Sequence, residues 1–356
     1  MMPARPRSTE KDRPGVSPRS RVPKSTIVDI AAASGVSVST VSRILNDKPD
    51  VAAQTRERVL RIMDEMGFAP QSAWQQIRSG RTRLIAMHVP PEFNPPAYHL
   101  IIAAALGVED AGYSITIITR ALGDSELLGI FRGRHADGII LLEILADDHR
   151  PELLRDHGFP FVMIGHRADN TGLSFVDVDI EHGMGLAVDH LAELGHREIA
   201  LLTVDPVVQD KTYGFATWAL RGFQAACERL GLCAWPSVGG PSEAAMATAA
   251  LGLMDAHPGI SAFIAPQQQS VIGVLMAARA RSLRLPQDLS LIGMLSESMS
   301  GLATPTLTAI DFPADELGRL AAQMLLDRLD GGQAWPRQVL LPAQLIVRES
   351  TAVPRT

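Results

Sequence analysis

The segment STIVDIAAASGVSVSTVSRILNDKP, residues 25–49, contains the signals for two short helices joined by a tight turn. Thr26 can cap the first helix, with Asp29 at its third position, in a variant of the capping box. Gly35 supplies a left-handed residue that ends this helix, and Ser37 is placed to cap a second one. The pattern predicts a helix-turn-helix, in which the second helix enters a DNA groove.

The second helix is unusually rich in serine and threonine, which are poor helix formers. Short hydroxyl side chains allow close approach to DNA and can donate to phosphates or base edges, and Arg43 can donate a bidentate pair to guanine. In the alternative interpretation, the hydroxyl side chains of the second helix form only a polar surface. The spacing of Val41, Ile44 and Leu45 instead predicts packing against the first helix. We favour DNA contact for the hydroxyls and Arg43.

The charge is distributed unevenly along the chain. Residues 1–83 carry 15 Lys and Arg against 8 Asp and Glu, a net +7, and the remainder carries 18 basic and 31 acidic residues, a net −13. A basic end on an acidic body is typical of nucleic-acid binding, although charge alone also fits a solvated basic tail. The sequence has no apolar run of about 18 residues and no apolar N-terminal segment, so we expect a cytoplasmic protein without a membrane partner.

Beyond Arg83 short apolar runs alternate with helical segments. The runs that predict strands covered on both faces by helices are 84–89, 114–119, 137–142, 160–165, 197–204, 261–265 and 288–294. Helices are predicted over 181–194 and 213–230, with Gly195 and Gly231 just beyond their ends. This alternation indicates a doubly wound parallel α/β architecture, whose ligand sites lie beyond the carboxyl ends of the strands.

Several sequence blocks, in order along the chain, resemble the lactose-repressor (LacI/GalR-type) family. They are TIVDIAAASGVSVSTVSRILN at 26–46, TRERVLRIMDEMGFAP at 55–70, GHREIALL at 195–202, LRLPQDLSLIGM at 283–294, PTLTAIDFP at 305–313 and LIVREST at 345–351. The resemblance implies an all-α headpiece and an α/β body of two doubly wound parallel-sheet lobes, like periplasmic sugar-binding proteins. It also implies an effector-responsive transcriptional repressor that binds a palindromic operator as a homodimer.

The resemblance further implies the organisation of the chain. Residues 1–22 are expected to be a disordered basic tail, 23–68 the helix-turn-helix domain, 69–81 a hinge helix and linker, and 82–356 the effector-binding and dimerisation module. Within that module, lobe one is expected at about 82–180 and 312–340, and lobe two at about 181–311 and 341–352.

The DNA contacts implied by the resemblance fall into three groups. Val38, Ser39 and Arg43 match base-reading positions. Positions that touch phosphate are matched by Ser37, Thr40, Ser42 and Asn46, and Thr26 is also a DNA-binding candidate. The stretch QSAWQQIRSG at 71–80 resembles a hinge helix that folds on the operator, with Ile77 in place of the usual leucine wedge and Trp74 where alanine is common.

Three polar positions of the family's effector cleft differ in this chain. Ala219 replaces an arginine, Gln267–Gln268 replaces an Asn–Asp pair, and Leu295 replaces an aspartate. These changes remove groups that suit vicinal hydroxyls, so we predict a neutral or partly apolar small-molecule effector rather than a typical sugar. The alternative is a body retained only for dimerisation. The remaining effector-binding candidates are Tyr98, Arg167, Tyr213, Trp218, Gln268 and Ser296.

The sequence gives little support to an enzymatic function. It contains no HExxH, paired-cysteine or G-x-S-x-G motif, and its ten histidines show no metal-ligand spacing. We therefore predict no catalytic residues, metal or cofactor. The rival class is a cytosolic solute-binding protein or α/β enzyme with an incidental basic N-terminus, and the helix-turn-helix with its hinge argues against it.

Overall fold

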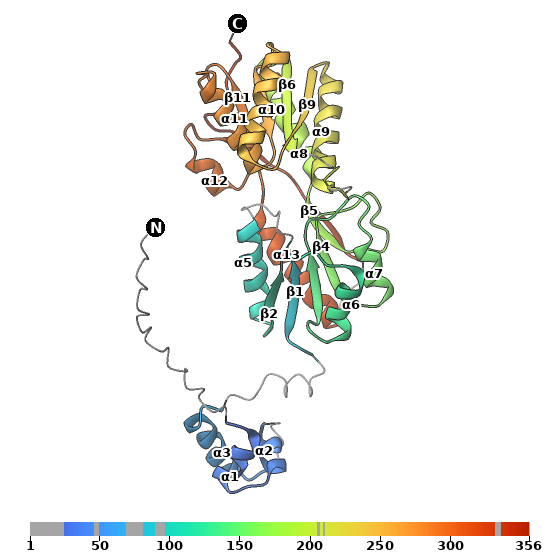
Figure 1. Ribbon diagram of the computed structural model, residues 1–356, viewed down its shortest axis with the longest axis vertical. Helices are drawn as coiled ribbons and strands as arrows, with labels where there is room; N and C mark the ends of the chain where they lie inside the picture. Colours follow the sequence, from blue (N-terminus) through green and yellow to red (C-terminus); the bar gives the residue numbers. More distant parts are fainter. Residues whose placement is uncertain are drawn as a thin grey trace, which may run out of the picture. The chain divides into compact units, whose positions relative to one another are not determined.

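The computed structural model describes residues 25–45, 50–68, 81–89, 97–204, 207–208, 211–331 and 336–355. The chain divides into two compact units, one before Arg81 and one from Arg81 onward (Figure 1). The expectations for the basic tail 1–22, for Asn46 and for the hinge segment 69–80 with Trp74 and Ile77 lie outside the described residues.

The N-terminal unit contains three helices, α1 (Ile27–Ser34), α2 (Val38–Leu45) and α3 (Ala53–Glu65). Their apolar faces meet in one small core, in which α2 contributes Val41 and Ile44. The buried members of this core are Ile30, Ala31, Val41, Ile44, Val59 and Met63. The predicted helix-turn-helix and all-α headpiece are confirmed, and Leu45 lies at the margin of the core.

The turn signals act as the sequence predicts. Thr26 Oγ1 accepts from the Asp29 backbone N–H at 3.3 Å, and the Asp29 carboxylate accepts from the Thr26 N–H at 2.8 Å, which completes the capping box. Gly35 ends α1 with φ of 65°. Ser37 Oγ accepts from the Thr40 N–H at 3.1 Å at the start of α2.

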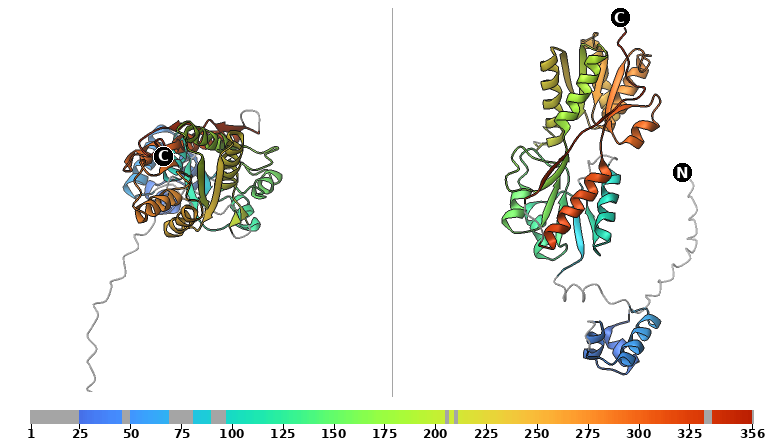
Figure 2. Two further views of the ribbon diagram at one scale, coloured as in Figure 1. Left: turned by 90° about the horizontal axis from the view of Figure 1, so that it is seen from above. Right: turned by 180° about the vertical axis from the view of Figure 1, so that it is seen from behind.

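Lobe one of the second unit is a six-stranded parallel sheet in the order β13-β5-β4-β3-β1-β2. Its strands are β1 (Leu84–His88), β2 (Ser114–Ile118), β3 (Gly138–Leu141), β4 (Phe161–Ile164), β5 (Phe175–Val178) and β13 (Gln338–Leu341). One face is covered by α5 (Ala97–Glu109) and α13 (Ala314–Leu329), and the other by α6 (Asp124–Arg132) and α7 (Arg150–Asp156) (Figures 1 and 2).

Lobe two has the sheet order β14-β12-β11-β10-β6-β9, with only β14 antiparallel. Its strands are β6 (Glu198–Val204), β9 (Cys233–Gly239), β10 (Ala262–Ala265), β11 (Ser290–Leu295), β12 (Thr308–Asp311) and β14 (Leu345–Ile346). The flanking helices are α8 (Ile180–Glu193), α9 (Gly214–Leu230), α10 (Glu243–Ala256), α11 (Gln268–Ala280) and the short α12 (Glu297–Leu302). A small hairpin of β7 (Val207–Val208) and β8 (Lys211–Thr212) precedes α9.

Both sheets are buried on both faces because successive strand residues point to opposite sides. In β1, Ile85 and Met87 pack in the core under α5 and α13, whereas Ala86 packs in the core under α6 and α7. The chain crosses between the lobes three times, after Val178, after Asp311 and after Leu341. Sheet membership therefore places Leu341 in lobe one, one residue beyond the expected end.

The predicted fold class is confirmed, and every strand predicted from an apolar run is present. Five strands of the two lobe sheets were not predicted, namely β5, β9, β12, β13 and β14, nor were the two short strands of the hairpin, β7 and β8. In β5 the apolar run is short and contains Asp177, and β9 is an edge strand that contains Pro236. Within the described ranges no single helix is long and apolar enough to cross a membrane. Helices α1 and α2 reach the necessary length and apolar character only when they are counted together, and the pair is bent by 106°.

Candidate nucleic-acid interface and ligand cleft

The exposed face of α2 collects the predicted DNA contacts. Ser37, Val38, Ser39 and Arg43 are exposed, and Thr40 and Ser42 are half-buried. Val41 and Ile44 point the other way and hold α2 against the rest of the headpiece. Thr26 is exposed at the start of α1. Since the apolar positions fix the rotation of α2, the hydroxyl and arginine side chains are presented on its outer face.

Three hydroxyl groups gather at the N-terminus of α2. Ser37 Oγ lies 2.7 Å from Ser39 Oγ and 2.8 Å from Thr40 Oγ1. The first turn of α2 carries no acidic residue. The partial positive charge of a helix N-terminus and nearby hydroxyl donors both favour a phosphate group. This end of α2 therefore suits contact with the DNA backbone.

Arg43, in the last turn of α2, is placed to reach beyond the helix. Its Nη1 lies 3.4 Å from Asp50 Oδ2, and both side chains are more than half exposed, at 62% and 52%. Such an exposed ion pair contributes little to stability, so Arg43 can exchange Asp50 for a base edge at small cost. The sequence did not single out Asp50, because nothing in its local pattern marks it as a partner of Arg43.

The six predicted effector residues do not form one constellation. Tyr98 is 69% exposed on the outer face of α5. Trp218 is buried in α9 against His166, and the backbone of Tyr213 pairs with that of Leu145. Gln268 is the first residue of α11, and Ser296 precedes α12 with its Oγ 3.2 Å from that of Ser298. Arg167 belongs to a network of charged groups in lobe one.

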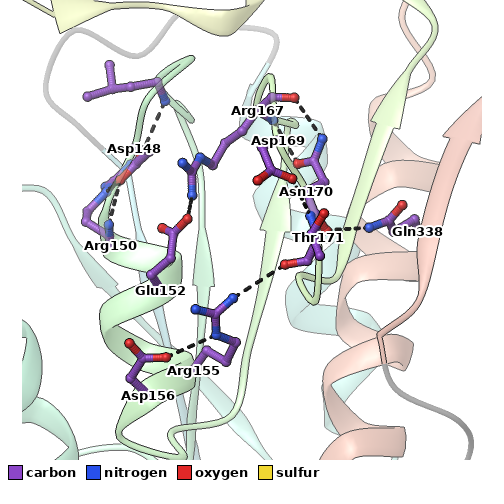
Figure 3. Close-up of polar contacts among 11 residues, drawn as sticks. Asp148, Arg150, Glu152, Arg155, Asp156, Arg167, Asp169, Asn170, Thr171 and Gln338 are labelled. Atoms are coloured by element: carbon purple, nitrogen blue, oxygen red, sulfur yellow. Dashed lines mark hydrogen bonds and ion pairs between the residues drawn. The ribbon is translucent and has the colours of Figure 1, made fainter.

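Charged side chains in this network are paired within lobe one (Figure 3). The Asp148 carboxylate accepts from Arg150 Nε at 2.9 Å, and Arg167 pairs with Glu152. Burial alone would raise the pKa of Asp148, but the hydrogen bonds and charge of Arg150 outweigh it and hold the pKa below its usual range. Asn170 fixes the Arg167 backbone, because its amide accepts from the Arg167 N–H at 2.9 Å and donates to the Arg167 carbonyl at 2.7 Å.

Most side chains at the three altered cleft positions are packed or hydrogen-bonded within lobe two. Ala219 and Leu295 are buried in the apolar cores of lobe two. Gln267 is also buried, and its Nε2 donates to Thr203 Oγ1 at 3.0 Å. The neighbouring Gln268 has a buried Oε1 without a hydrogen-bond partner among the described residues.

A cavity of about 630 Å³ lies beside the crossing that follows β12. It is lined by His99, Ser296, Glu297, Ser298 and residues 311–316, so Ser296 is the only predicted effector residue that it contains. Burial, and then the nearby Glu297 carboxylate, raise the pKa of Asp311 above its usual range. In the part of the chain that the structure describes, no group of three or more His, Cys, Asp or Glu residues is arranged to hold a metal ion.

A three-helix headpiece with an exposed reading helix, joined to a body of two parallel-sheet lobes, defines a DNA-binding regulator of the periplasmic-binding-protein-like type. Residues 26–71 match the lacI family of bacterial regulatory proteins, and residues 188–351 match the periplasmic binding protein-like domain. The chain is 32% identical over 344 residues to the HTH-type transcriptional regulator MalR of Streptomyces coelicolor, with 92% of this chain and 96% of MalR covered. The chain belongs to the LacI family.

Solved structures show the same relationship. The lac repressor dimer bound to operator and the anti-inducer ONPF is 25% identical, with a TM-score of 0.81 and coverage of 92% of this chain and 99% of that chain. The complex of the transcriptional regulator CelR with cellobiose is 28% identical, with a TM-score of 0.67 and coverage of 92% and 100%. This chain is thus a DNA-binding transcriptional regulator, as the sequence predicts.

Proposed function

We propose that this regulator is an effector-responsive repressor that binds a palindromic operator as a homodimer. The observation that carries the proposal is the exposed face of α2, where Val38, Ser39 and Arg43 are available for base edges. Phosphate contacts are assigned to Ser37, Thr40 and Ser42, and Thr26 is a further candidate for contact with DNA. The resemblance to the family assigns a further phosphate contact to Asn46 and the minor-groove wedge to Ile77.

Footprinting on genomic DNA tests the repressor assignment. We expect bound sites to overlap promoters, because a repressor acts by occupying the region that the transcription machinery needs. Transcript levels of the adjacent genes should rise when the protein is deleted, and a strain with Arg43→Ala should behave like the deletion strain. A fall in those transcripts on deletion would identify an activator instead.

The dimer is proposed to form along an apolar stripe of lobe one, the dimer surface, which consists of Tyr98, Ile102, Leu106 and Ile117. Ile102 and Leu106 are 58% and 62% exposed and follow Tyr98 at four-residue spacing, so all three share one face of α5. Ile117, on the adjacent edge strand β2, is 48% exposed. Exposed apolar patches of this kind mark interaction surfaces, and the related lac repressor is a dimer. Tyr98 is therefore assigned to the dimer surface rather than to the effector.

The effector is proposed to be neutral or partly apolar and to bind between the lobes. The paired Arg167 and Glu152 carry no net charge, yet Arg167 Nε and Glu152 Oε2 are buried without hydrogen-bond partners among the described residues. A donor and an acceptor are thus available without an unpaired charge. Around the cavity, two of the four acidic side chains have a basic neighbour, since Glu297 lies 3.6 Å from Arg348 and Asp315 lies 3.7 Å from His99.

Thermal-shift measurements test this ligand class. A ligand that binds only the folded protein raises the melting temperature by mass action. We expect glucose, glucose 6-phosphate and cellobiose to give no shift and to leave operator affinity unchanged, whereas a neutral, partly apolar compound should change both. A clear shift with cellobiose, the ligand in the CelR complex, together with altered operator binding, would show that a sugar is the effector.

A further inference from the structure

A column of four stacked side chains, the interlobe stack, runs from lobe one into lobe two. Phe175 of β5 and His166, which follows β4, have ring centroids 5.4 Å apart. The His166 ring lies 4.8 Å from the ring of Trp218 in α9, with only 6° between their planes. The guanidinium carbon of Arg221, one turn further along α9, lies 4.7 Å from the Trp218 ring centroid. The contact between His166 and Trp218 therefore crosses the lobe boundary.

Each half of the interlobe stack is fixed within its own lobe. In lobe one, His166 Nδ1 lies 2.7 Å from a carboxylate oxygen of Asp177 in β5. In lobe two, Arg221 Nη1 donates to Glu181 of α8 at 3.1 Å. Because both rings are oriented by groups in their own lobes, a change in the relative orientation of the lobes must separate or offset the His166 and Trp218 planes.

The backbone beside the interlobe stack also joins the lobes. The Gly214 N–H at the start of α9 donates to the Ile144 carbonyl of lobe one at 3.2 Å. A Cβ atom at position 214 would lie 3.0 Å from the His166 carbonyl oxygen and 3.1 Å from Trp218 Nε1. Glycine at this position thus lets α9 approach lobe one closely enough for the rings to stack.

The buried position of Trp218 leaves its indole N–H without a hydrogen bond to the described residues. The residue is only 3% exposed, and its Nε1 has no hydrogen-bond partner among the described residues. A buried donor without a partner is unfavourable, and it would regain a hydrogen bond with water if the lobes separated. Ring burial and stacking favour the closed contact instead. These opposing effects describe a contact that can open.

We propose that the interlobe stack is a latch that holds the two lobes in one relative orientation, with Trp218 as a positioning residue for operator binding. The role of Trp218 in operator binding rests on the proposed function. Operator affinity depends on the fraction of molecules whose body is in the binding-competent arrangement. Trp218 acts on that fraction through His166 and does not itself touch DNA.

The test compares Trp218→Ala with a matched control, Trp235→Ala. Trp235 stacks on His257 with ring centroids 3.5 Å apart and donates from Nε1 to Glu198 at 3.0 Å, so it forms a tryptophan–histidine stack entirely within lobe two. Hydrogen exchange of the full chain reads out the Gly214 N–H, which bonds across the lobe boundary. Operator affinity is measured by titration on the same samples.

We expect Trp218→Ala to lose protection at Gly214 and to bind operator about 5–10-fold more weakly, with a change below about 2-fold for Trp235→Ala. Trp218→Phe keeps a stacking ring and should retain protection at Gly214. His166→Ala disrupts the same contact from lobe one, so it should reproduce the effects of Trp218→Ala and replaces that variant if it fails to fold.

Unchanged protection at Gly214 in both disruptive variants would overturn the latch. Lost protection with unchanged operator affinity would overturn only the positioning role, and absence of operator binding by the wild-type chain would count against the proposed function alone.

Discussion

Arg43→Ala is expected to weaken operator binding by about 1–3 kcal/mol, or about 5- to 150-fold in affinity, and to relax base preference at one position in each half-site. Arg43 stands on the exposed face of α2, and its ion pair with Asp50 is easily exchanged for a guanine edge. Truncation leaves that base without its bidentate donor. Binding titrations on operator and on random DNA at one salt concentration measure the effect.

Two further variants make the Arg43 result specific. Arg43→Lys keeps the charge but cannot form the planar bidentate pair, so it should retain binding to random DNA and lose operator preference. Arg61→Ala removes an exposed arginine of α3 that pairs with Glu65, and operator preference should be unchanged. Equal losses on operator and random DNA for Arg43→Ala would refute base reading by this residue.

The double variant Ile102→Glu/Leu106→Glu is expected to convert the dimer to monomers and to weaken operator binding by at least about 100-fold. Two carboxylates in the middle of the dimer surface would face an apolar surface without partners, which opposes association. A monomer presents one reading helix and loses the gain from binding two half-sites at once. Analytical ultracentrifugation gives the oligomeric state, and titration on whole and half operators gives the affinities.

Leu340→Glu is the matched control for the dimer surface. Leu340 is 48% exposed on β13, at the opposite edge of the same sheet from β2. This variant should remain dimeric with wild-type operator affinity. A double variant that sediments as a dimer, or a control that dissociates equally, would place the subunit contact elsewhere.

The headpiece could be predicted from sequence because its determinants are local. Thr26, Asp29, Gly35 and Ser37 each act within a few residues of their own position, so capping and turn preferences are sufficient to place α1 and α2. The central strands of the body could also be predicted from sequence, since strands covered on both faces are continuous apolar runs. Edge strands such as β9 are half-exposed and lack that signal.

The contacts of the ligand cleft were much harder to predict from sequence, because they join distant parts of the chain. Tyr98 and Trp218 are both aromatic residues near the starts of helices, yet one lies on an exposed apolar stripe and the other under His166 of the opposite lobe. The partner of Arg167 is Glu152 on α7, a pairing that no local pattern indicates. Residue type identified polar and aromatic candidates, but their partners are determined by tertiary packing.

Selection of binding sites from random double-stranded DNA by the full-length chain is the most direct test of sequence-specific recognition by paired reading helices. The enriched sequences should form a palindrome of two inverted half-sites roughly one helical turn apart, with an easily kinked step at the centre. Arg43→Ala should lose preference at the same base pair in both half-sites. Enrichment of a single asymmetric half-site bound by a monomer, or of no sequence at all, would contradict the account.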